Sequence, residues 1–249
     1  MTTDLEHAGD VGVALTSVKS IEFGAASVHC AGLLSPSEAA EVADAVLRAP
    51  AELVRQAWET SDSRMCTVGE ALYRNRDRLD HYVTCAREDN PVIYRRFRPL
   101  YERVATFFER RYGAPVVFAE ELAVPGFHVF EYARAGRFEG GGWHFDCLYL
   151  QAPFLVSRAE EIQGVVNFTL PLEVPRGGTG MDVCDDELGA VHPGDGVRVA
   201  VPYVPGVMVF TEREFWHRIG PSTCLLDGER RVTLQGHGVH IGEGWLLFW

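Results

Sequence analysis

Two histidines and one aspartate in the C-terminal half of the chain have residue types and a spacing suited to binding a metal ion. His144 and Asp146 are two positions apart, with Phe145 between them, and His217 follows 73 residues after His144. In an extended strand, side chains at positions i and i+2 point to the same face, so His144 and Asp146 can reach one ion together. Only a fold that returns the chain to the same place can supply His217 as the third ligand.

This donor set has a characteristic chemistry. Two imidazoles and one carboxylate on one face of an octahedron leave three positions open, an arrangement typical of non-haem Fe(II) oxygenases. An isolated H-x-D pair also occurs often by chance, and a strand histidine is more often a hydrogen-bonded structural residue than a ligand. The interpretation as a metal site therefore depends on the sequence around it.

The N-terminal half of the chain, which must support such a site, has helical signals. After an opening extended stretch, Ser35-Pro36-Ser37-Glu38 has a capping residue, a proline at the first helical position and a glutamate at the third, which predicts a helix over about residues 36–48. A second helix is predicted to end at Gly113, because apolar residues before it repeat at three- and four-residue steps. These residues are Ile93, Phe97, Leu100, Val104, Phe107 and Phe108.

The C-terminal half has the composition of a β protein. Twenty of the 25 glycines follow residue 112, and Gly/Pro turns separate short β-rich runs. The predicted strands cover residues 127–132, 143–150, 165–170, 197–201, 207–210 and 232–241. No helical crossover pattern separates them, which disfavours a parallel doubly wound sheet and favours a sandwich, jelly roll or barrel. A jelly roll would bring His217 back to His144.

Four features of this half occur in the order found in a known superfamily. First, a strand ending in a tyrosine precedes H-x-D within residues 127–146, and second, a Gly-Gly turn follows an apolar strand within residues 165–179. Third, Pro-Gly and an apolar strand precede the distal histidine within residues 205–217. Fourth, a basic residue lies on the next strand, within residues 228–235. Over roughly residues 120–240 the chain thus resembles the Fe(II)- and 2-oxoglutarate-dependent oxygenases, in particular their prolyl-4-hydroxylase-like branch.

The resemblance implies a fold and an arrangement of domains. The fold class is α+β with a mainly β core, a double-stranded β-helix (a cupin-like jelly roll) with N-terminal helices packed on one sheet. We expect a single domain over residues 1–249, with a helical N-terminal layer at about 33–113 and the jelly-roll core at about 114–242. It also implies that His144, Asp146 and His217 are the metal ligands and the catalytic centre.

A binding site for 2-oxoglutarate is implied as well. In the family a basic side chain pairs with the distal carboxylate, often with a hydroxyl residue two positions on, and Arg231 with Thr233 fits this pattern. Arg230 points to the other face of the strand and is expected in solvent. Tyr132 is a candidate to donate its hydroxyl to the same carboxylate, the alternative being an aromatic at the core edge. A buried carboxylate needs such fixed partners, and guanidinium offers two parallel donors.

The resemblance further implies an activity. We expect a dioxygenase that uses Fe(II), 2-oxoglutarate and O2, releases succinate and CO2, and hydroxylates an unactivated C–H bond. Desaturation and ring formation are the alternative outcomes of the same chemistry. Asp146 disfavours halogenation, because related halogenases have a small residue there that leaves room for halide. The compact chain favours a small-molecule substrate, a free amino acid or biosynthetic intermediate, with residues 60–90 and 151–163 as lids. The alternatives are a prolyl-type hydroxylase of protein residues and a non-catalytic cupin-like metal- or ligand-binding protein.

Other polar residues are expected to be structural. His237 and His240 are three residues apart in a strand-like run, so their side chains face opposite ways and cannot bind one ion together. His128 lies in an apolar strand. The arginines of residues 74–78 are expected on an exposed face, and the alternative is that they bind a substrate carboxylate.

Composition excludes several partners. The net charge of -12 disfavours nucleic acid, and no apolar run is long enough to span a membrane. The acidic N-terminus is unlike a signal peptide, and six cysteines without a C-x-x-C pair suit the reduced cytoplasm, which is the expected location. The sequence leaves the oligomeric state open.

Overall fold

A computed structural model describes residues 18–24, 26–60, 63–132, 135–186 and 196–249. The helices are α1 (Pro36–Leu47), α2 (Leu79–Arg96), α3 (Arg98–Tyr112) and α4 (Pro153–Val156), with 3-10 turns η1 (Ala51–Leu53), η2 (Leu72–Arg74), η3 (Leu148–Leu150) and η4 (Ala159–Glu161). The strands are β1 (Lys19–Phe23), β2 (Ala26–Gly32), β3 (Val54–Glu59), β4 (Ser63–Val68), β5 (Val116–Val117), β6 (Gly126–Tyr132), β7 (Gly136–Phe138), β8 (Ile162–Glu173), β9 (Gly180–Cys184), β10 (Arg198–Pro202), β11 (Val207–Thr211), β12 (Trp216–Ile219), β13 (Ser222–Leu225), β14 (Arg230–Ile241) and β15 (Gly244–Phe248).

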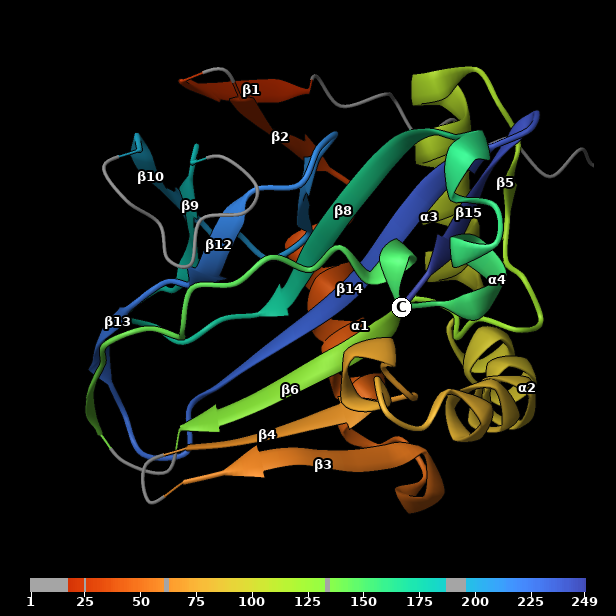
Figure 1. Ribbon diagram of the computed structural model, residues 1–249. Helices are drawn as coiled ribbons and strands as arrows, with labels where there is room; N and C mark the ends of the chain where they lie inside the picture. The colour runs from red at the N-terminus through yellow and green to blue at the C-terminus, as the bar shows by residue number, and fades with distance from the viewer. Residues whose placement is uncertain (1–17, 25, 61–62, 133–134, 187–195) are drawn as a thin grey trace, which may run out of the picture.

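The strands form one large sheet and two small ones. The main sheet has the order β1-β2-β11-β8-β14-β6-β4-β3, and β15 joins β14 to β5. The small sheets are β10-β9-β12 and β13-β7. In Figure 1, α1 and α3 lie behind the main sheet, whereas β9, β10 and β12 stand at its left. This arrangement confirms the predicted fold class, a jelly roll with helices on one sheet.

Helices α1 and α3 pack on the outer face of the main sheet. Along β8, alternate residues point to opposite faces, so Phe168 faces the helices whereas Asn167 and Thr169 face the small sheets. Phe108 of α3 contacts Phe168 with ring centroids 5.3 Å apart and Phe210 of β11 with centroids 5.9 Å apart. This apolar layer leaves the inner face for other groups.

Two apolar clusters close the space between the main sheet and the small sheets. At one end, Val183 of β9 and Val201 of β10 pack with Val209 of the main sheet. At the other end, Leu225 of β13 packs with Met65 and Phe130. Between the two clusters, polar side chains such as Asn167 and Thr169 lie on the inner face of the main sheet, the face toward the small sheets.

The first predicted helix is confirmed, and the second is two helices. At α1, the backbone N–H of Glu38 donates to Ser35 Oγ over 3.2 Å, and the Glu38 carboxylate accepts from the Ser35 N–H over 2.7 Å. The second predicted helix breaks at Phe97 between α2 and α3. Pro99 has no N–H and its ring clashes with the carbonyl one turn back, which ends α2. Gly113 ends α3 as predicted, with a left-handed φ of 67°.

Other predicted boundaries are wrong. Residues 143–150 are not a strand: His144 makes an isolated bridge, Cys147 has a φ of 38°, and η3 follows. The predicted N-terminal helical layer also contains β3 and β4, and β4 pairs with β6 in the main sheet, so this part of residues 60–90 is sheet rather than lid. No helix in the described part of the chain is long and apolar enough to span a membrane.

Candidate metal centre

A glycine-rich segment brings His144 beside β12. The Gly141 N–H donates to the Ile219 carbonyl over 2.8 Å, and two further backbone hydrogen bonds of 2.9 and 3.0 Å join His144 and His217 in both directions. Gly140 has a φ of 104°, and a Cβ there would lie 2.9 Å from the Ile219 carbonyl oxygen, so this approach requires glycine. The bridge places the two histidines opposite each other although they are far apart in the sequence.

The predicted ligand residues converge. His217 Nε2 lies 3.2 Å from Asp146 Oδ2, and His144 Nε2 lies 4.0 Å from Asp146 Oδ1. One donor atom from each residue lies within 4.8 Å of the other two. Phe145 points away and packs on Trp216, with ring centroids 4.3 Å apart. The geometry therefore brings the two imidazoles and the carboxylate to one point.

The backbone orients both imidazoles for metal binding. His144 Nδ1 lies 2.9 Å from the Gly142 carbonyl oxygen, and His217 Nδ1 lies 3.2 Å from that of Phe215. Each Nδ1–H can thus donate to a carbonyl, which leaves the Nε2 lone pair directed at the centre. Two neutral imidazoles and one carboxylate fit Fe(II) and leave coordination positions open.

The pKa values of Asp146 and His144 suit the same role, and His217 would lose its proton on binding a metal. Burial raises the pKa of Asp146, but the neighbouring imidazoles, His217 foremost, outweigh burial and hold this pKa well below its ordinary value. Burial lowers the pKa of His217, yet the Asp146 carboxylate raises it above the ordinary value. The pKa of His144 is lowered, by burial first and then by His217. At neutral pH, Asp146 is therefore ionised and His144 is neutral.

Arg231 shares a cavity of about 390 Å³ with the three donor residues. Its side chain is 1% exposed and lies over the Phe130 ring, 5.3 Å from the ring centroid. Within the described part of the chain, Arg231 Nε and Nη2 have no hydrogen-bond partner. Buried guanidinium N–H groups are costly without an acceptor, so the site is suited to an anionic ligand. Arg230 points away and pairs with Glu173 over 3.0 Å.

Thr233 and Tyr132 lie outside the residues that line this cavity. Both are buried, and neither hydroxyl has a partner among the residues described. Tyr132 packs in an aromatic cluster with Phe130 and Phe138, at centroid distances of 4.7 and 5.7 Å. The structure thus places Tyr132 at the edge of the core, and contact of either hydroxyl with a ligand stays a prediction.

Several cavity residues were not predicted as site residues. His237 Nδ1 lies 2.6 Å from Asn167 Oδ1, and both side chains line the cavity. The two-residue steps from Arg231 to His237 along β14 are a signal that could have placed His237 on this face. Tyr73 and Glu214 also line the cavity, but they lie outside the strands, and no sequence pattern indicates their position.

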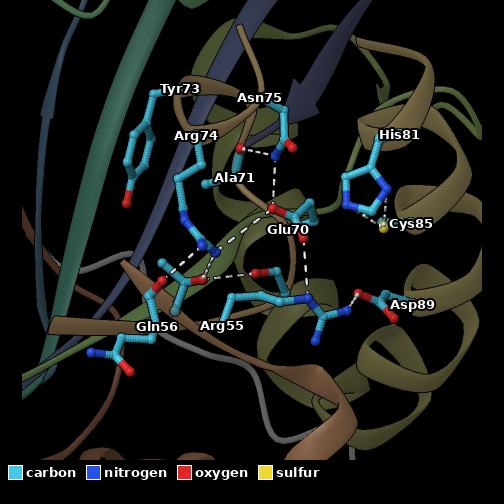
Figure 2. Close-up of polar contacts among 12 residues, drawn as sticks. Arg55, Gln56, Glu70, Ala71, Tyr73, Arg74, Asn75, His81, Cys85 and Asp89 are labelled. Atoms are coloured by element: carbon cyan, nitrogen blue, oxygen red, sulfur yellow. Dashed lines mark hydrogen bonds and ion pairs between the residues drawn. The ribbon is translucent and has the colours of Figure 1, made fainter. Parts of the chain in front are cut away.

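A second group of possible metal donors consists of Glu70, His81 and Cys85, again with donor atoms within 4.8 Å of one another. Figure 2 shows that Glu70 lies between two arginines. Its carboxylate is 3.1 Å from Arg55 Nε and 3.7 Å from Arg74 Nη1. The exposed face predicted for the arginines of residues 74–78 is therefore wrong at Arg74.

This second group is poorly suited to a cation. Glu70 also accepts a hydrogen bond of 2.7 Å from Asn75, so both carboxylate oxygens are in use. Burial raises the pKa of the Cys85 thiol, and a protonated thiol is a poor ligand. Cys85 Sγ lies 3.7 and 3.6 Å from the two ring nitrogens of His81, so it faces the ring rather than one lone pair. The contacts around Glu70 indicate a structural ion-pair network.

Comparison with known proteins finds similarity in structure but not in sequence. No protein family model matches the chain, and no curated protein is significantly similar to it. An N-substituted L-amino acid dioxygenase from Burkholderia ambifaria AMMD superposes with a TM-score of 0.56 at 15% identity, covering 89% of this chain and 86% of that one. Its complex with α-ketoglutarate gives a TM-score of 0.55 at 13% identity, covering 93% and 98%.

The chain has the fold of this dioxygenase. The predicted resemblance to 2-oxoglutarate-dependent oxygenases is confirmed for the fold. A prolyl-4-hydroxylase from Pseudomonas putida is also similar, with a TM-score of 0.39 at 16% identity over 86% of this chain and 92% of that one.

Proposed function

We propose that the chain is an Fe(II)- and 2-oxoglutarate-dependent dioxygenase that hydroxylates a C–H bond of a small metabolite. One observation carries this proposal: the three converging donors and the buried Arg231 line the same cavity. The donors suit a divalent ion, and the unpartnered guanidinium suits the far carboxylate of a dicarboxylic keto acid chelated to that ion. The structurally similar dioxygenase was crystallised with α-ketoglutarate, which supports this assignment.

Each residue has a defined part in this function. His144, Asp146 and His217 would hold Fe(II), and Arg231 would bind the distal carboxylate of 2-oxoglutarate; Thr233 and Tyr132 stay candidates to assist it. Iron and 2-oxoglutarate together supply the activation of O2, with release of succinate and CO2. The chain itself holds one substrate C–H bond beside the open coordination positions and excludes water. Trp58, Tyr73 and Trp249 give the cavity aromatic walls suited to this exclusion.

A small substrate fits this cavity. A volume of about 390 Å³ is near the lower end of the range for small-molecule pockets. The structurally similar enzyme acts on N-substituted L-amino acids. We therefore propose a free amino acid or a related biosynthetic intermediate as the substrate.

The test is a screen for substrate-stimulated succinate release, with Fe(II), 2-oxoglutarate and O2 present. The candidates are free and N-substituted amino acids and, in parallel, proline-containing peptides. Stimulation by a free small molecule, lost in His144→Ala, supports the proposal. Stimulation by peptides alone would instead make the chain a hydroxylase of protein residues. A folded, iron-loaded protein that binds no 2-oxoglutarate would be a binding module.

A further inference from the structure

Glu214 is a buried carboxylate in the cavity that the proposed chemistry does not use. It lies between β11 and β12, is 6% exposed, and lines the cavity. Its Oε2 atom has no hydrogen-bond partner within the described residues. Glu214 is also outside the group of donor atoms that lie within 4.8 Å of one another at the metal centre. Glu214 is therefore available for a role other than binding the metal.

Neighbouring groups hold this carboxylate in place. The Asn167 side-chain amide and the Cys147 backbone N–H lie near this carboxylate and stabilise its ionised form. Asn167 Oδ1 lies 2.6 Å from His237 Nδ1 and accepts from it, which leaves the Asn167 amide nitrogen available to another acceptor. Because Cys147 follows Asp146, Glu214 is fixed beside the metal centre. Oε2 has no partner among the described residues and is therefore available to a donor from a bound ligand.

Among the described residues, no arginine or lysine forms an ion pair with Glu214. The two arginines nearest in sequence that line the cavity have other partners: Arg218 pairs with Asp182 over 2.8 Å, and Arg213 pairs with Asp185. Burial, reinforced by the Asp146 charge, raises the pKa of Glu214 to about 7. When Fe(II) and 2-oxoglutarate are bound, their charges and those of Asp146 and Arg231 cancel. The ionised form of Glu214 then carries an excess negative charge, which either a proton or a cationic group of a ligand would neutralise.

We infer that Glu214 recognises a positively charged nitrogen of the substrate, an ammonium or a protonated secondary amine, through Oε2. This inference rests on the proposed function and specifies its substrate class. A metabolite without a hydrogen-bond donor leaves the buried carboxylate without a partner, and a neutral donor leaves its charge uncompensated, so both are disfavoured. The contact with the Cys147 backbone places the bound nitrogen on the side of the cavity next to Asp146.

The experiment measures binding to the anaerobic protein loaded with Fe(II) and 2-oxoglutarate. Free and N-methylated L-amino acids are compared by calorimetry with the matching 2-hydroxy acids, which replace the ammonium with a hydroxyl. We expect at least one amine to bind roughly 10- to 100-fold more tightly than its hydroxy acid, the range for a charge-assisted hydrogen bond. Glu214→Gln, which keeps the shape and removes the charge, should abolish this preference.

Glu212→Gln is the matched control. Glu212 lies two residues away, is about 40% exposed on its side chain and pairs with Arg111, so this variant should keep the preference. The visible band of the Fe(II)–2-oxoglutarate chelate should form equally in wild type and Glu214→Gln, which shows that both are folded and loaded. Absence of the band in wild type would refute the proposed function. If the band forms, two results would overturn the inference. The first is that wild type binds the amines and the 2-hydroxy acids equally, or binds neither. The second is that Glu214→Gln keeps the preference for the amine.

Discussion

The chain contains two groups of possible metal donors that are similar in composition and opposite in surroundings. In the cavity, the Asp146 carboxylate lies beside the imidazoles of His144 and His217. In the second group, the Glu70 carboxylate forms ion pairs with the guanidinium groups of Arg55 and Arg74. Imidazoles can lose a proton and ligate, whereas guanidiniums stay charged and repel a metal cation. The neighbours of a carboxylate therefore decide whether it can bind a metal.

The arginines show the same contrast. Arg55 is already neutralised by Glu70 and Asp89, each 3.1 Å away. Arg231, which is 1% exposed, has two N–H donor atoms without partners in the part of the chain described. Paired arginines stabilise a fold, and a buried arginine with unpartnered donors is suited to bind a ligand. The two regions therefore differ in whether the protein itself compensates the charge of the arginine.

The largest effect is expected from removing a ligand of the cavity site. His217→Ala should reduce 2-oxoglutarate turnover by more than about 100-fold, because it deletes a ligand and even residues that only orient ligands contribute 10- to 100-fold. His81→Ala removes the corresponding histidine of the second group and should leave turnover unchanged. Succinate formation measures both. Retained turnover in His217→Ala, or its loss in His81→Ala, would reverse the assignment of the two groups.

Removing the central carboxylate of the second group should affect stability instead. Glu70→Ala removes one of the acceptors of Arg55 and of the buried Asn75, and the ion pair with Arg74, and should lower the free energy of unfolding by about 2 to 4 kcal/mol. Chemical denaturation measures this change, with exposed Glu41→Ala on α1 as a control that should have little effect. The Fe(II) stoichiometry of folded Glu70→Ala should be unchanged. A lower stoichiometry would make the second group a metal site.

The two faces of β14 offer a finer comparison. Arg231→Ala should raise the KM for 2-oxoglutarate roughly 10- to 100-fold, because a charge-assisted interaction with its carboxylate is lost. Arg230→Ala, on the opposite face and paired with Glu173, should leave the KM near its wild-type value. Steady-state kinetics over a range of 2-oxoglutarate concentrations separates them. Equal effects would show that Arg231 does not bind the co-substrate.

The smallest effect concerns pH. Asp146 raises the pKa of His217, so protons compete with the metal as pH falls through that pKa, and affinity should drop about tenfold per unit below it. The Asp146 carboxylate, with its lowered pKa, stays ionised over the same range. Fe(II) titrations under anaerobic conditions at several pH values measure this. Affinity that rises on acidification would contradict the assigned donor set.

Much of the fold follows from local sequence signals. The capping box of α1, the glycine after α3 and the β-rich runs of β6, β8, β11 and β14 were predicted because each depends on neighbouring residues. The strand predicted for residues 143–150 was wrong because those residues are apolar enough for a strand, yet only His144 has a pairing partner. Strands β3 and β4, which extend the main sheet beyond β6, were not predicted, because the pairing of β4 with β6 joins residues far apart in the sequence.

The candidate site divides in the same way. Types and spacing in the sequence indicated His144, Asp146 and His217, the resemblance to 2-oxoglutarate-dependent oxygenases indicated Arg231, and the fold brings all four to one cavity. Glu214 could not be predicted, because an acidic residue in a short loop is ordinarily exposed and only the tertiary structure buries it. Similarly, the charge neighbours that disqualify Glu70 come from β3 and η2 and are visible only after folding.

The central claim is that His144, Asp146 and His217 form one centre that binds Fe(II) together with 2-oxoglutarate. Anaerobic titration of the protein with Fe(II) in the presence of 2-oxoglutarate tests it most directly. The account predicts a visible charge-transfer band that saturates at a single equivalent of Fe(II), persists in His81→Ala and is absent from His217→Ala. A folded wild-type protein that gives no band, or a band that survives in His217→Ala, would contradict it.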